Sequence, residues 1–228
     1  MRSITKLRLT AAVLFTLIAA IGCNPLTGAY FMLFGIDDKI PPEFKIGGDG
    51  KHVVRVAILV SSIQESRADL LGVERQLSAA MAKSLDMECK MNKERIQIVP
   101  VYKVEEFKTN NPGWRTMPLN EIAKKFDVDF LVDVEIKSLS LYEKDSRRQL
   151  FRGRSAVTLS VIDAAKSTDE SQVYQKPMCV EYPKARGPLP VDDDMTVERF
   201  RDVFIQRIAT DLAWQLTSHV STAGMMED

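Results

Sequence analysis

The chain has 228 residues, with 31 basic and 31 acidic side chains and 45% hydrophobic residues. This composition excludes a disordered polyampholyte, a collagen-like fibre and a small disulfide-rich domain. Removal of residues 1–22, which carry three basic and no acidic side chains, leaves a net charge of −3. Nucleic-acid binders usually carry a basic excess, so we expect a globular domain that does not bind nucleic acid.

The amino terminus has the order of a secretory signal peptide, with a basic start, an uncharged run from Leu9 to Gly22 and a small residue before Cys23. As a helix this run is about 21 Å long, shorter than the ~30 Å hydrocarbon core, so a membrane span is the weaker interpretation. Residues 20–23, Ala-Ile-Gly-Cys, resemble a bacterial lipobox, which implies that Cys23 is lipidated. The alternative is ordinary secretion with Cys23 a plain thiol. Asn24 implies, by the same resemblance, sorting to the outer membrane.

Residues 23–51 are predicted to be a lipid-anchored tether. They contain Pro41-Pro42, which stiffens the chain into a spacer, and an apolar run from Ala29 to Ile36. The run either inserts at the membrane surface, docks on a neighbouring subunit, or packs on its own domain as an edge strand. The candidate docking residues are Tyr30, Phe31, Met32, Leu33 and Phe34.

The folded domain is expected over residues 52–222, with a flexible tail at 223–228. Its first element is a nearly continuous apolar run, Val53–Val60, typical of a strand covered on both faces. A helix that begins near Ser66 follows, because apolar residues recur at helical spacing as far as Leu85.

A second strand is predicted at Arg95–Val104, with Pro100 at an edge or a bulge. Turn residues then indicate a loop from Glu105 to Met117. Pro118 begins a short helix, because the residues after it are apolar at positions i, i+3, i+4 and i+7. Alternating apolar residues predict a third strand from Phe130 that continues to Tyr142.

The segment Phe151–Asp163 also alternates, and the charged turn Lys144–Arg148 joins it to the preceding strand, which predicts an antiparallel hairpin. A further strand is expected at Gln172–Tyr182 and a loop at Pro183–Pro190. The last helix is predicted from Met195 to about Val220, behind three aspartates that suit its positive end. Its apolar stripe at i+4 spacing comprises Phe200, Phe204, Ile208, Leu212 and Leu216. The fold class is therefore α/β, with a mixed sheet of four or five strands backed by helices.

Cys89 and Cys179 are the remaining cysteines, and in a secreted protein both would lie in an oxidising compartment. One interpretation is a disulfide between them. The other is that Cys89, which lies between Met87 and Met91, is a small buried hydrophobic residue. The spacing does not choose between the two.

The chain carries no motif of a known catalytic type, and its histidines are His52 and His219 alone. We therefore expect a non-enzymatic protein without cofactor or metal. One alternative is an envelope hydrolase that uses carboxylates of the strand Asp129–Glu135, and another is a lipid or glycan carrier with an apolar pocket between helix and sheet. Four arginines around the hairpin turn are candidate contacts for anionic lipid or glycan, although exposed hairpin tips are usually charged. They are Arg147, Arg148, Arg152 and Arg154.

Three segments resemble parts of a group of bacterial envelope lipoprotein domains. Val56–Val60 resembles their first strand, Ile122–Ile136 their short helix running into a strand, and Val157–Asp163 a later strand that ends in Val-Asp. The group comprises the curli-secretion channel lipoproteins, the outer-membrane lipoprotein activators of peptidoglycan synthases, and the amino-terminal domain of the Tol-Pal translocation protein. Asp127 and Asp133 depart from it, because glycine is usual at both positions.

The resemblance implies an α/β fold in the bacterial envelope and a non-catalytic role in assembly, secretion or regulation of cell-wall synthesis. The expected location is the periplasmic face of the outer membrane. The expected partners are the membrane, through the lipid anchor, and another envelope protein or a second copy of the chain.

Overall fold

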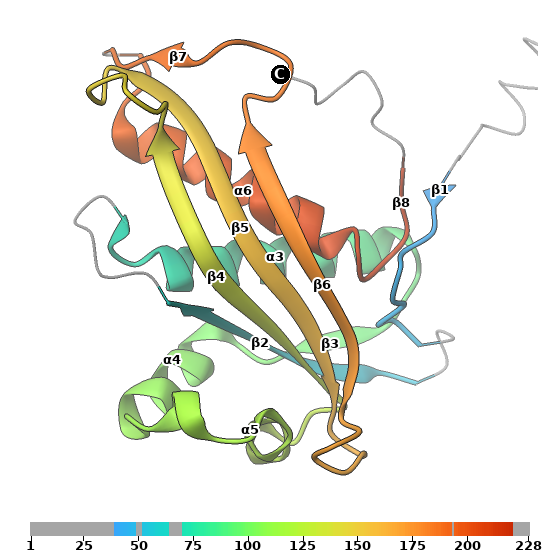
Figure 1. Cartoon of the computed structure of the whole chain (residues 1–228). Helices are drawn as coiled ribbons and strands as arrows, with labels where there is room; N and C mark the ends of the chain where they lie inside the picture. Colours follow the sequence, from blue (N-terminus) through green and yellow to red (C-terminus); the bar gives the residue numbers. More distant parts are fainter. Residues whose placement is uncertain (1–38, 49–51, 64–69, 193, 221–228) are drawn as a thin grey trace, which may run out of the picture. The chain divides into compact units, whose positions relative to one another are not determined.

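The computed structural model describes residues 39–48, 52–63, 70–192 and 194–220, all within one compact unit. The predicted signal peptide, Cys23, the candidate docking residues at 30–34 and the predicted tail lie outside these residues. The described part is an α/β domain built on one mixed sheet, in the strand order β3-β2-β4-β5-β6, with β7 beside β5 (Figure 1). This confirms the predicted fold class.

The main sheet combines a parallel and an antiparallel half. β2 pairs in parallel with β3 and β4, whereas β4, β5 and β6 form an antiparallel meander. Its strands are β2 (Val54–Ser62), β3 (Ile96–Ile98), β4 (Phe130–Tyr142), β5 (Leu150–Asp163), β6 (Gln172–Tyr182) and the two-residue β7 (Leu189–Pro190). The predicted hairpin is β4–β5, and β6 has the predicted bounds.

Helices cover the two faces of this sheet unequally. α3 (Val73–Met91) and α6 (Val197–Ala213) pack together on one face and bury the larger core. α4 (Val101–Asn110), the single-turn 3-10 helix η2 (Trp114–Thr116) and α5 (Leu119–Phe126) cover the opposite face over β2, the start of β4 and the end of β5 (Figure 1). β2 is therefore covered on both faces, as its continuous apolar run predicts.

The predicted apolar stripe of the last helix is confirmed, because all five of its residues are fully buried. The helix itself is shorter than predicted. It begins after Thr196, whose side chain accepts a hydrogen bond from the Arg199 backbone N–H at 3.3 Å, and it ends at Ala213. The chain then turns into β8 (His219–Val220), which pairs with β1 (Lys39–Ile40).

The predicted strand at Arg95–Val104 is too long, and the predicted loop at Glu105–Met117 is wrong. Only Ile96–Ile98 form a strand, and Pro100 occupies the N-cap of α4, where its missing N–H leaves no hydrogen bond unmade. The expected loop is largely helical because Val104 and Trp114 are buried against the outer face of β2. Contacts between segments distant in the sequence therefore override the turn signals.

The first described residues belong to the domain, although the sequence places them in the tether. Ile46 is only 1% exposed, and its backbone N–H donates to the Leu216 carbonyl at 3.0 Å. The Phe44 ring contacts Phe130 and Tyr174. The folded domain therefore begins upstream of residue 52.

Candidate functional site

The carboxylates at the start of β4 hold the local backbone together. Asp127 follows α5 in a left-handed conformation, with φ 51°, and forms an ion pair with Arg55 on β2. Asp129 accepts a hydrogen bond from the Arg55 backbone N–H at 2.7 Å. Both acids therefore fix the connection from α5 into β4 against the neighbouring strand.

Farther along β4, Asp133 and Glu135 occupy a different environment. Burial, together with the nearby Glu135, raises the pKa of Asp133 to about 7, and the cations of Lys108 and Lys137 oppose this rise. Glu135 forms an ion pair with Lys137 at 2.6 Å. Neither acid lines the pockets described below. This pair of carboxylates therefore gives no support to the alternative that the protein is a hydrolase.

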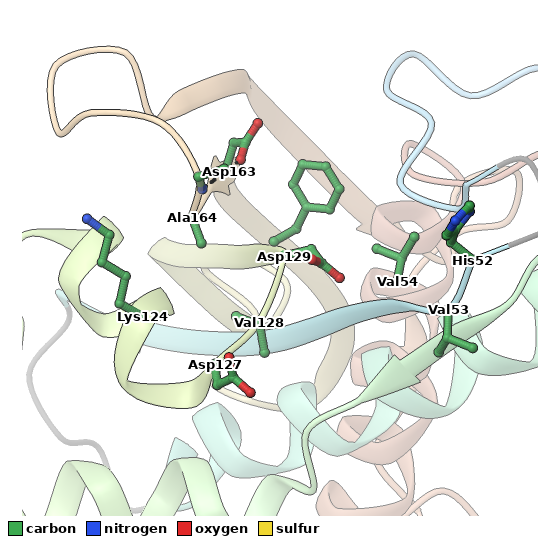
Figure 2. Close-up of a pocket in the computed structure, with 11 residues that line it drawn as sticks. His52, Val53, Val54, Lys124, Asp127, Val128, Asp129, Asp163 and Ala164 are labelled. Carbon is green, nitrogen blue, oxygen red and sulfur yellow. Dashed lines mark hydrogen bonds between the residues drawn. The ribbon is translucent and has the colours of Figure 1, made fainter.

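An open pocket of about 740 Å³ lies at the amino-terminal ends of β2 and β4. Figure 2 shows Lys124 and His52 at opposite ends of the pocket in this view, with Asp127 and Asp129 between them and Asp163 near the Lys124 end. Asp163 accepts a hydrogen bond from the Ala165 backbone N–H at 2.9 Å. Asp127 thus pairs with the Arg55 side chain, whereas Asp129 and Asp163 accept from separate backbone N–H groups, so the three acids do not form a catalytic pair.

Within the described ranges, no three histidine, cysteine, aspartate or glutamate side chains gather as metal ligands. None of the helices described by the structure combines the length and the apolar composition needed to cross a membrane.

The four candidate arginines do not act as one anion-binding cluster. Arg152 and Arg154 contact Glu143 at 3.2 and 3.0 Å, and Arg154 also lies 3.5 Å from Glu181. The hydrogen bond from Arg154, with a smaller contribution from Arg152, holds the pKa of the Glu143 carboxyl below its usual value. The charges of these two arginines are therefore compensated within the sheet.

The other two arginines lie in the turn itself. The guanidinium of Arg148 lies 5.5 Å from the centre of the Tyr142 ring, a cation–π contact. Both Arg147 and Arg148 are exposed. These two residues remain accessible to an anionic partner.

The half of the sheet farthest from α5 has a face that no described helix covers. Val157 and Leu159 point into the core with α3 and α6, so Arg154, Ala156 and Thr158 point to the opposite side. Cross-strand pairing extends this side into three rows, which we call the open sheet face. The rows are Ser140–Arg154–Glu181, Ser138–Ala156–Cys179 and Glu135–Thr158–Pro177.

Of the two interpretations of the cysteine pair, the disulfide is wrong, because Cys89 and Cys179 are both free thiols. Cys89 lies on α3 in the larger core, where burial raises the pKa of its thiol to about 12. Cys179 is exposed on the open sheet face, the side opposite α3. The sheet therefore separates the two thiols, and the alternative interpretation of Cys89 as a buried small residue holds.

No protein-family model matches the chain, and no curated protein matches it. Similar solved structures include the PelC dodecamer from Paraburkholderia phytofirmans, at 9% identity and a TM-score of 0.43, covering 78% of this chain and 95% of that one. Lipoprotein GNA1162 from Neisseria meningitidis is 10% identical, with a TM-score of 0.37, and the match covers 72% of this chain and 99% of that one. Protein XCC0632 from Xanthomonas campestris is 8% identical, with a TM-score of 0.42, and the match covers 77% of this chain and 86% of that one. At these TM-scores the similarity carries no argument about the function of this chain.

Proposed function

We propose that the chain is a non-catalytic, lipid-anchored protein of the bacterial envelope, whose domain binds another envelope component. The amino-terminal pattern that ends in Cys23 supports the anchor and the compartment. The open sheet face supports the binding role and is the observation that carries it, because helices cover both faces of one half of the sheet, whereas no described helix covers this face of the other half.

The open sheet face has the character of a reversible docking surface. Its central row consists of the small side chains of Ser138, Ala156 and Cys179, with the compensated charges of Arg154 and Glu181 beside it. A centre without charged side chains, surrounded by a charged rim, suits a protein interface. The edge strand β6 carries Pro177, which discourages indiscriminate pairing with other strands.

Partner capture from the native envelope tests this role. Ala156→Arg places a bulky charge in the central row of the open sheet face, between Ser138 and Cys179, and is expected to reduce the captured partner at least about tenfold, because an unmatched charge at an interface centre is costly. Thr109→Arg, at an exposed position on α4, serves as the matched control and should leave capture unchanged. The full-length chain is cross-linked in its membrane, solubilised and purified, and partners are quantified by mass spectrometry.

The apolar segment of the tether is the competing docking site in the same experiment. If Phe31, Leu33 and Phe34 bind the partner, their joint replacement by Ser abolishes capture and leaves the melting temperature unchanged. Capture that survives both this variant and Ala156→Arg contradicts both docking sites.

Acylation of Cys23 is a separate prediction of the proposed function. The membrane-extracted protein should begin at Cys23 and carry the added mass of acyl chains, and Cys23→Ala should release the protein from the membrane. Each buried methylene contributes about 0.8 kcal/mol to anchoring, so loss of the chains shifts the partition strongly. Intact mass decides, because a mature chain that begins elsewhere or lacks acyl mass contradicts the anchor.

A further inference from the structure

A second cavity, of about 240 Å³, lies beside the edge strand β3, between the start of α4 and the end of α5. Its volume is just below the range of sites that hold drug-sized ligands, so it suits a smaller molecule. The cavity shares no lining residue with the pocket of Figure 2 or with the open sheet face. It therefore needs an explanation of its own.

Strand pairing places two polar side chains next to each other in the wall of this cavity. Arg55 of β2 and Gln97 of β3 are cross-strand neighbours, and both line it. Ala57 and Leu59 of β2 lie in the core beneath α4 and α5. Because alternate residues of a strand point to the same side, Arg55 also points toward these helices.

Arg55 is held in place by the acids at the start of β4. Its guanidinium forms an ion pair with Asp127, and Asp129 accepts a hydrogen bond from its backbone N–H. Both acids line the pocket of Figure 2 and not this cavity. A guanidinium has five N–H donors, so the pair with Asp127 leaves others for a ligand. Arg55 is thus a positioned donor whose own charge is compensated.

Two lysines supply charge that is not compensated. Lys103 belongs to the first turn of α4 and Lys125 to the last turn of α5, and both side chains are exposed and line the cavity. Glu106 and Glu121 lie one helical turn from them, yet neither lysine forms an ion pair within the described part of the chain. Lys125 lies 5.7 Å from the centre of the Phe107 ring, which leaves its charge in place. Two positive charges therefore remain to be matched.

The rest of the lining is apolar. It consists of Ile98, Val99, Pro100 and Phe126, so the described residues that line the cavity include no acid. An apolar wall with a few converging polar groups is typical of sites for small organic molecules. Here the polar groups are cations and one amide, which indicates a ligand with an anionic group and an apolar part.

We propose that this cavity binds a small phosphate monoester, with its phosphate between Arg55, Lys103 and Lys125 and its apolar part against Phe126. A phosphate monoester carries about two negative charges near neutral pH, which matches the two uncompensated lysines. Arginine and lysine are the side chains that most often bind phosphate oxygens. The proposal does not depend on the docking role, because the open sheet face lies on the other half of the sheet.

Titration calorimetry on the detergent-solubilised full-length chain tests this site. The probes are phenyl phosphate and benzoate, which share a ring and differ in the anionic group, and sodium chloride at equal ionic strength is the reference. We expect saturable binding of phenyl phosphate and weaker binding of benzoate, which carries a single charge. Lys103→Gln and Lys125→Gln should each weaken phenyl phosphate binding about tenfold, since each removes one charged donor. Lys103→Arg keeps the charge and should retain the affinity.

Lys124→Gln is the matched control, because Lys124 precedes Lys125 on α5, is also exposed and lines the pocket of Figure 2 instead. It should leave the affinity unchanged. No saturable binding of phenyl phosphate up to about 10 mM overturns the proposal. So does benzoate that binds as tightly as phenyl phosphate, or a Lys124→Gln effect as large as that of Lys125→Gln. Melting temperatures identify a variant that folds poorly, and the other glutamine variant then decides.

Discussion

Phe204→Ala should destabilise the domain by about 3–5 kcal/mol, a large part of the 5–15 kcal/mol that stabilises a typical domain. Phe204 is fully buried in the larger core, with its ring centre 6.3 Å from that of Phe200. Its replacement removes apolar contacts and leaves a cavity between α6 and the sheet. The melting temperature should fall by about 6–20 °C, measured by circular dichroism.

The control for this prediction is Val203→Ala, because Val203 is the preceding residue of α6 and is 38% exposed. It should change the melting temperature little. Gly153 offers a second test, since a Cβ there would meet the Phe204 ring at 2.6 Å. Gly153→Ala should therefore cost less in the Phe204→Ala background than in the wild type. A Phe204→Ala protein that melts within a degree or two of the wild type would mean that the stripe faces a partner or a membrane.

Asp133→Asn should stabilise the domain at pH 8 and have little effect at pH 4. The pKa of Asp133 rises from its ordinary value of 3.8 to about 7 in the folded protein. Between these values the folded state binds more protons than the unfolded state, so stability falls as the pH rises through this window. Asparagine is neutral, so the substitution removes the free-energy cost of ionising the Asp133 carboxyl in the folded protein. At pH 8 this cost amounts to at most about 4 kcal/mol.

Chemical denaturation of both proteins from pH 4 to pH 8 measures this difference. Asp86→Asn is the control, because Asp86 forms an accessible ion pair with Lys90 on α3 and should change stability by no more than about 0.5 kcal/mol at any pH. A stability difference between Asp133→Asn and the wild type that stays constant across this range would show that the Asp133 carboxyl does not titrate with a raised pKa.

Several elements of the fold could be predicted from the sequence because their signals are local. The apolar run at Val53–Val60 predicts a strand covered on both faces, and α3 with α6 on one side and α4 with α5 on the other provide that cover. Alternation and a charged turn predict the β4–β5 hairpin. The i+4 stripe of α6 predicts which of its residues lie in the core. The stripe and the alternation of the hairpin strands can be recognised because each repeats at the period of its own backbone.

Other features depend on contacts that no local pattern contains. Pro100 suits either a strand edge or a helix start, and packing of Val104 and Trp114 on β2 decides for the helix. Ile46 looks like part of a spacer until its pairing with Leu216, 170 residues away along the chain, draws it into the core. Cys89 and Cys179 remain ambiguous until the sheet is seen to lie between them.

The candidate sites divide in the same way. The sequence by itself predicts the signal that ends in Cys23 and shows no familiar catalytic motif, because both are read from consecutive residues. Only the tertiary structure decides that Arg154 is compensated by Glu143 and Glu181, and that the buried hydroxyl of Ser155 has no hydrogen-bond partner among the residues that the structure describes. Charge compensation and burial depend on neighbours that folding brings together from distant segments. The separation of two residues along the sequence does not say how far apart they lie in the folded protein.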